Sequence, residues 1–116
     1  MEPKFLPSSM RQPKRYVVFE VVSEHNIEYQ DLVSAVWNST LALLGEAMSS
    51  EARPWFIVNL YMPEKQKGVL KCAHNMVEQM RAALSLITMV GESRSIVRIL
   101  GITGTISSAQ EKYLKQ

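Results

Sequence analysis

The chain has 116 residues, of which 47% are apolar and 21% charged, and its formal net charge is +2. These proportions match an average soluble domain and exclude a largely disordered chain. A single cysteine excludes a disulfide framework and a multi-cysteine zinc site. No apolar run reaches the roughly 18 residues of a membrane span, and the N-terminus has no apolar core of a secretory signal. We therefore expect one domain in a reducing, intracellular compartment.

The charges are distributed unevenly along the sequence. Residues 1–15 have four basic residues against one acidic residue, residues 16–64 have one against seven, and residues 65–116 have eight against three. Two basic ends around an acidic middle favour one face for a polyanion and another for a protein partner. Ordinary solvated surface is the alternative.

The first half of the chain predicts an arm, a strand and a helix. Residues 1–14 contain three prolines and no apolar periodicity, so we expect a flexible basic arm before a single α+β domain at 15–116. Alternating apolar residues predict a strand over 16–23. Apolar residues at helical spacing predict a helix over 27–48, with a possible interruption at Gly45.

The second half predicts three more strands and two helices. Strands are expected over 55–62, with one continuous apolar face, and over 69–73, returning as a hairpin. A helix should then start near Val77 and end at Gly91 in the left-handed conformation. The last strand is expected over 95–102, followed by a short C-terminal helix.

Side-chain caps are predicted at each helix start. Asn26 is the expected N-cap of the first helix. Asn75 with Glu78, and Ser108 with Glu111, have the spacing of capping boxes before the second and the C-terminal helix.

The element order is β-α-β-β-α-β, which is the ferredoxin-like or RRM-like order. It predicts an α+β fold: an antiparallel sheet with helices on one face, plus the C-terminal helix and the flexible N-terminal arm. The other sheet face is too apolar to be left bare, and the C-terminal helix or another chain could cover it. We assign Trp55, Ile57 and Tyr61 to a partner interface on that face.

The sequence offers little for catalysis. His25, Cys72 and His74 are the available soft ligands, and Cys72 should behave as a small core hydrophobe. We find no carboxylate pair with acid–base spacing and no glycine-rich phosphate loop. The third strand also lacks the aromatics with which an RNA-recognition motif stacks bases. The chain alone is therefore predicted to be non-catalytic, with no bound metal.

Four segments occur together in one order: RYVVFEV from Arg15, LKC from Leu70, RAALSLI from Arg81 and LGITGTI from Leu100. As a set they resemble the ribonuclease P protein component 2 family over about residues 11–106. The resemblance implies a protein subunit that assists a catalytic RNA in removing 5′ leaders from precursor tRNA. It implies that the RNA binds the Mg²⁺, so that the chain itself holds no cofactor.

The resemblance also implies partners and a location. These are ribonuclease P RNA, precursor tRNA and the TIM-barrel protein component 3, in a possible two-plus-two heterotetramer. The compact length favours an archaeal, cytoplasmic chain, whereas a eukaryotic one would be nuclear or nucleolar. A protein-protein assembly module and a small-ligand-binding ferredoxin-like domain, both without an RNA function, remain the alternatives.

Basic residues and one glycine-containing segment are the RNA-binding candidates, because cations position phosphates and a Gly-x-x-Gly turn can clamp a nucleic-acid backbone. Some follow from the family-like segments and others from charge alone. The complete set is Lys4, Arg11, Lys14, Arg15, Lys65, Lys67, Lys71, Arg81, Arg94, Arg98, Gly101, Thr103, Gly104 and Thr105.

Overall fold

The computed structural model describes residues 13–115. Of the predicted arm, residues 1–12 lie outside the described residues, and Lys4 and Arg11 lie there with them. Lys14 already forms part of the first strand.

Within residues 13–115, five strands form one antiparallel sheet in the order β2-β3-β1-β5-β4. The strands are β1 (Lys14–Ser23), β2 (Trp55–Phe56), β3 (Lys67–Ala73), β4 (Met89–Val90) and β5 (Ser93–Thr103). The first four in this order reproduce the strand order of a ferredoxin-like fold, and β4 adds a short hairpin at the edge.

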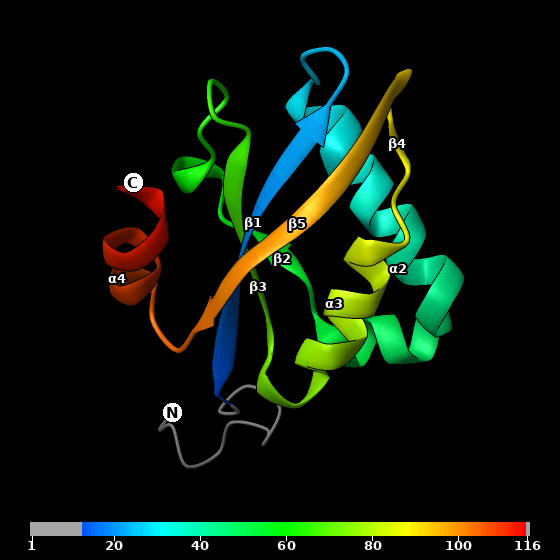
Figure 1. Cartoon of the computed structure of the whole chain (residues 1–116). Helices are drawn as coiled ribbons and strands as arrows, with labels where there is room; N and C mark the ends of the chain where they lie inside the picture. Colours follow the sequence, from blue (N-terminus) through cyan, green and yellow to red (C-terminus); the bar gives the residue numbers. More distant parts are fainter. Residues whose placement is uncertain (1–12, 116) are drawn as a thin grey trace.

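The helices divide between the two faces of this sheet (Figure 1). On one face lie α2 (Tyr29–Ala52) and α3 (Val77–Ser85), which pack against each other. On the other lies the C-terminal helix, made of α4 (Ile106–Ala109) and the π-helical turn η4 (Gln110–Leu114). The predicted α+β architecture is therefore confirmed, including the C-terminal helix.

The main core fills the space between the sheet and the α2–α3 layer. Val17 and Phe19 of β1 and Leu70 of β3 are buried there against Leu32 of α2 and Met80 of α3. Alternation along β1 selects these residues, since every second side chain points to the same face. Complete burial of each large side chain contributes about 1.5–3 kcal/mol, so this layer supplies most of the stability.

A second, smaller core lies under the C-terminal helix. Val18 and Val69 from the sheet are buried against Ala109 and Leu114. The sequence analysis expected either the C-terminal helix or another chain to cover this face of the sheet. In the structure the C-terminal helix covers its middle.

A bulge in β5 fits the sheet to this helix. The register between β1 and β5 shifts between Val18 and Phe19, so that Val18 pairs with Gly101 and Phe19 with Ile99. The extra residue, Leu100, packs against the second core. A Cβ on Gly101 would overlap the ring of Tyr113, so glycine here permits close contact between helix and strand.

The predicted strand over 55–62 is wrong beyond its first two residues. After Ile57, whose N–H donates to the Val69 carbonyl, the chain leaves the sheet as a 3₁₀ turn at Val58–Leu60. It returns at a single bridge between Met62 and Lys67. The turn breaks the two-residue alternation, so the expected continuous apolar face does not form.

The predicted caps are also wrong in detail. The first helix begins at Tyr29 with Glu28 as its N-cap residue, in place of Asn26. The second follows a 3₁₀ turn, η3 (His74–Met76), so the box of Asn75 and Glu78 is displaced. Neither start has a side-chain cap among the described residues.

At the C-terminal helix the predicted box gives way to a different cap. Thr105 is the N-cap residue, and its hydroxyl accepts a hydrogen bond from the N–H of Ser108. Glu111 instead forms an ion pair with Lys115, 2.9 Å apart.

Two glycines hold the conformations that the sequence suggested. Gly45 interrupts α2 with φ 77° and ψ 175°. Gly91 is left-handed, with φ 60°, as expected. It lies in the tight turn between β4 and β5, however, because α3 ends earlier, at Ser85.

Replacing Gly101 by alanine should push Tyr113 off the sheet and lower the free energy of unfolding by about 1–2 kcal/mol. Gly104→Ala is the matched control, because a Cβ there has no atom within 4 Å. It should change stability by less than about 0.5 kcal/mol. In a Tyr113→Ala background, Gly101→Ala should become nearly neutral, and a full cost there would contradict the proposed contact. Urea denaturation measures all three.

Candidate functional site

The soft side chains do not assemble a reactive centre. Cys72 is fully buried in the main core, and burial raises the pKa of its thiol to about 11 despite the nearby Lys14. The backbone N–H of His25 donates to Ser93, and the His74 ring lies 3.2 Å from the carbonyl of Pro13. Residues 13–115 contain no cluster of three potential metal ligands. Cys72, His25 and His74 thus lie apart from one another in three different environments.

Five basic side chains from three strands share one face of the sheet. Alternation from Val18 and Val69, which lie under the C-terminal helix, assigns this face to the even-numbered residues of β1 and the odd-numbered residues of β3. Before the bulge, the even-numbered residues of β5 share it. The members are Lys14, Lys67, Lys71, Arg94 and Arg98, which we call the cationic strand face.

This face has two cationic ends with the C-terminal helix between them. Lys14 and Lys71 lie where β1 begins, since Tyr16 pairs with Lys71. Lys67 and Arg98 lie further along, opposite one another across Glu20. The Lys67 ammonium also donates to the Tyr113 carbonyl at 3.4 Å, which joins this end to the helix.

Glu20 neutralises this end only in part. Its carboxylate lies 3.8 Å from the Arg98 guanidinium, whose side chain remains 60% exposed. An exposed pair at this separation is weak and screened by salt. Arg98 therefore keeps donors available for a phosphate or a carboxylate.

Other predicted RNA-binding residues lie away from this face. Arg15 pairs with Cys72 and faces the α2–α3 side, with a hydrogen bond from its guanidinium to the Lys14 carbonyl. Arg81 lies on α3, where its guanidinium Nε is 3.8 Å from Oε1 of Glu78. Lys65 lies in the turn that follows Met62.

The Gly-x-x-Gly segment has mostly structural contacts. Gly101 lies beneath Tyr113. The Thr103 hydroxyl donates to the Thr105 carbonyl, and the Thr105 hydroxyl caps the C-terminal helix. Gly104 has open space around it. This segment thus forms the turn that connects β5 to α4.

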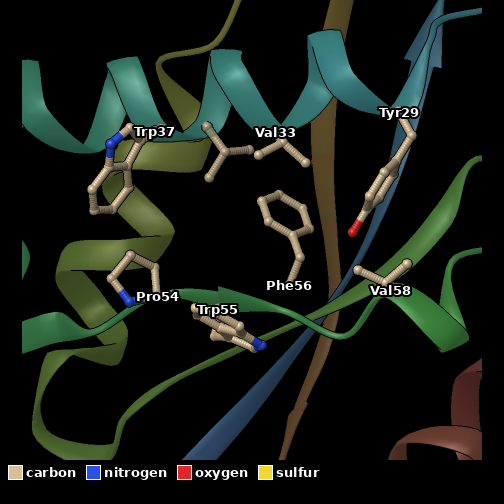
Figure 2. Close-up of a pocket in the computed structure, with 8 residues that line it drawn as sticks. Tyr29, Val33, Trp37, Pro54, Trp55, Phe56 and Val58 are labelled. Atoms are coloured by element: carbon tan, nitrogen blue, oxygen red, sulfur yellow. The ribbon is translucent and has the colours of Figure 1, made fainter.

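An apolar groove lies between α2 and the segment around β2 (Figure 2). It has a volume of about 400 Å³. Figure 2 shows Phe56 pointing from β2 towards Val33 of α2. The lining residues, which define the aromatic groove, are Tyr29, Val33, Val36, Trp37, Pro54, Trp55, Phe56 and Val58.

Two tryptophans beside the aromatic groove are unusually accessible, and only Trp37 faces it, because Trp55 pairs with Lys71 and points to the cationic strand face. Trp55 is 67% exposed and Trp37 is 46% exposed. Exposed tryptophans beside an apolar concavity are typical of protein-binding sites, because their large rings gain most from leaving water.

The three predicted interface residues separate in the structure. Trp55 lies at the aromatic groove, Ile57 packs under the C-terminal helix, and the ring centroid of Tyr61 lies 4.7 Å from that of Tyr29. Burial raises the pKa of both tyrosines. The sequence analysis missed Trp37, although an aromatic residue on the polar side of a predicted helix was a usable signal.

Charge separates the two surfaces. Asp31, Glu46 and Glu51 lie exposed on α2, and the Asp31 carboxylate lies beside Gly91 in the turn between β4 and β5. The cationic strand face lies across the sheet from α2. Acidic and basic side chains thus lie on opposite sides of the sheet.

No helix in residues 13–115 is both long and apolar enough to cross a membrane.

Comparison with protein families matches residues 15–114 to the model described as the Rpp14/Pop5 family. A protein of Pyrococcus abyssi named "Ribonuclease P protein component 2" is 37% identical over 116 residues, covering 100% of this chain and 97% of the relative. A protein of the same name from Methanosarcina barkeri is 38% identical over 112 residues, covering 97% and 80%.

Among solved structures, a chain of the cryo-EM structure of yeast Ribonuclease MRP superposes with a TM-score of 0.63. The match covers 90% of this chain and 87% of that chain at 13% identity. At this identity the similarity shows a shared fold.

The burial of Cys72 in the main core can be tested by the reactivity of its thiol. Because the pKa of its thiol is raised to about 11, the reactive thiolate is scarce at pH 8, and the side chain is also inaccessible. We expect the folded protein to react with a disulfide reagent at least ~100-fold more slowly than the urea-unfolded chain, since ionisation and access both limit it. Equal rates would show that Cys72 is exposed.

Proposed function

Because the chain belongs to the Rpp14/Pop5 family, we propose that it works as a protein subunit of ribonuclease P and assists a catalytic RNA in removing 5′ leaders from precursor tRNA. The observation that supports this role most directly is the cationic strand face, together with the absence of a reactive centre in residues 13–115. A subunit of this kind is part of an endoribonuclease without being the catalyst.

In this proposal the cationic strand face contacts the RNA backbone. Lys14 and Lys71 on one side of the C-terminal helix, and Lys67 and Arg94 on the other, offer two phosphate-binding ends on one surface. Cations at fixed positions on strands offset the repulsion between RNA strands that the folded RNA brings together. The Mg²⁺ ions that support cleavage belong to the RNA.

The aromatic groove is proposed as the docking site of a protein partner, the TIM-barrel component 3 that the family resemblance implies. Its exposed tryptophans and its volume of about 400 Å³ suit a protruding apolar side chain of such a partner. A two-plus-two assembly belongs to the same proposal, as does a cytoplasmic location in an archaeal cell, since the relatives described above are archaeal.

Reconstituted cleavage of precursor tRNA tests the role itself. Adding this chain and its protein partner to the cognate RNA should lower the Mg²⁺ concentration needed for half-maximal cleavage by several-fold, because protein cations replace part of the ionic screening. The chain alone should cleave nothing. An unchanged Mg²⁺ requirement would contradict the proposal, and cleavage by the chain alone would show that it is a nuclease.

The cationic strand face predicts a specific salt dependence. Lys14→Ala and Lys71→Ala should each reduce the slope of log K against log salt by about 0.7–0.9, because each removes one phosphate contact. Arg81→Ala, a cation on α3 away from this face, is the matched control and should change the slope little. If Arg81→Ala has the larger effect, the RNA contacts the α2–α3 side instead.

The aromatic groove predicts that protein and RNA binding can be separated. Trp37→Ala should weaken binding of the TIM-barrel protein by at least ~10-fold, as is typical of hot-spot tryptophans. Trp55→Asp should weaken it less, because the Trp55 side chain points to the cationic strand face. Leu86→Asp is the control, since Leu86 is exposed and lies outside the groove. RNA affinity should remain within about twofold in all three. Loss of RNA affinity in Trp55→Asp alone would assign Trp55 to the RNA, beside its neighbour Lys71.

A further inference from the structure

The outer edge of β5 is open along most of its length. On its inner side β5 pairs with β1 from Ser95 to Thr103. On its outer side β4 pairs only with Ser93 and Arg94. One further hydrogen bond, from the N–H of Ser95 to the Thr88 carbonyl, ends this contact.

The direction of the backbone groups along β5 follows from two hydrogen bonds. The carbonyl of Arg94 accepts from the N–H of Glu24, which directly follows β1, whereas the N–H of Ser95 points to the outer side. Backbone groups alternate along an antiparallel strand, so Val97 and Ile99 turn their N–H and C=O groups outward. Among residues 13–115 these groups have no backbone partner on that side. The edge thus offers two donors and two acceptors in the spacing of a β-ladder.

The side chains next to this edge add a chemical pattern. Ile96 and Arg98 point to the cationic strand face and are 56% and 60% exposed. On an added strand, the residues opposite them would occupy the positions where side chains approach most closely. A hollow of about 550 Å³, lined by Val22, Thr88 and Ile96 among others, lies at the start of the open edge.

From these features we propose that an extended segment of a partner protein adds to β5 as a sixth strand, with an acidic side chain opposite Arg98 and an apolar one opposite Ile96. Val97 and Ile99 each form two backbone hydrogen bonds with this segment, as in other cases of strand addition. The apolar residue lies over Ile96 and Val22 at the hollow. Glu24 and Arg94 both line the hollow and oppose each other in charge, whereas Arg98 is the cation opposite the added strand, so the acidic residue belongs at the Arg98 end.

Charge selects a partner protein over the other occupants. If a second copy paired edge to edge with Val97 opposite Ile99, the two Arg98 side chains would face each other, and like charges directly opposite are destabilising. An RNA backbone supplies phosphate acceptors and 2′-hydroxyl donors, but these do not repeat in the spacing of a β-ladder. Only an extended peptide satisfies both groups and Arg98 together.

Amide hydrogen exchange tests the added strand directly. The proposal rests on the proposed function in one respect, which is that the partner is a protein of the same ribonucleoprotein particle. The probe is the nuclease-treated complex of this chain with the proteins that co-purify with it. The amides of Val97 and Ile99 should exchange at least ~10-fold more slowly in the complex than in the free chain, as expected when exposed amides become hydrogen-bonded. Unchanged exchange overturns the proposal.

Two other outcomes also overturn it. Protection that returns only when RNA is restored would assign the edge to RNA, and protection that rises with the concentration of the free chain would assign it to a second copy. Precursor-tRNA cleavage by the untreated particle is measured in parallel. Active particles with unprotected amides would refute the added strand alone, whereas inactive particles with protected amides would refute the proposed function alone.

Two variant pairs support the measurement. Val97→Pro removes one outward N–H at an edge, where proline is tolerated, and should weaken the protein complex about tenfold in the absence of RNA. Val97→Thr keeps that N–H and is the matched control. Arg98→Glu should also weaken the RNA-free complex about tenfold, whereas Arg98→Lys, which keeps the charge, should restore most of the affinity. Full affinity in Arg98→Glu would overturn the acidic pairing.

Discussion

The alternation of side chains along β1 is the constraint on which the rest of the structure depends. This strand is paired along both edges, with β3 on one side and β5 on the other. Val17 and Phe19 bind the sheet to α2 and α3, whereas Val18 binds it to the C-terminal helix. A shift of one residue in β1 would exchange the two faces and expose both cores. The position of every surface discussed above follows from this register.

The same alternation separates the functional surfaces. Because Glu20 and its neighbours Lys67 and Arg98 share the face of Val18, the strand cations gather around the C-terminal helix. Phe56, which packs against the main core, turns to the opposite side and contributes to the aromatic groove with α2. In the proposed function, a sheet covered fully on one face and only in its middle on the other offers one side to RNA and one to protein. A subunit that supports a catalytic RNA within a larger assembly needs both.

Much of this arrangement could be predicted from the sequence, because the central strands and both long helices have strong apolar periodicity. The interruption at Gly45 was predictable for a different reason, which is the low helix propensity of glycine. The segment after Trp55 was not, because its apolar residues fit a strand equally well and only the 3₁₀ turn at Val58–Leu60 directs them to different partners. The predicted capping residues were wrong because several polar residues compete near each helix start, and tertiary packing decides among them.

The candidate sites divide in the same way. Alternation along the strands gathers Lys71 and Arg98 on one face, but the sequence analysis named these cations without assigning them to a face, because the strand order that makes them neighbours exists only in the folded sheet. The aromatic groove could not be predicted, since Tyr29 and Trp37 of α2 meet Trp55 and Phe56 only after folding. The Gly-x-x-Gly motif made Gly101 a candidate for RNA contact, which stays a prediction. The sequence did not indicate that the ring of Tyr113 packs directly on this glycine. Such roles depend on neighbours distant in sequence.

The separation of the two surfaces is the central claim, and cross-linking of RNA to protein in the reconstituted particle tests it most directly. Mass spectrometry should find RNA cross-links in peptides of β1, β3 and the start of β5 that contain Lys14, Lys71 or Arg94, and protein cross-links in peptides of α2 and β2 and at the outer edge of β5. RNA cross-links concentrated on α2 around Trp37, with the strand peptides unmodified, would contradict the account.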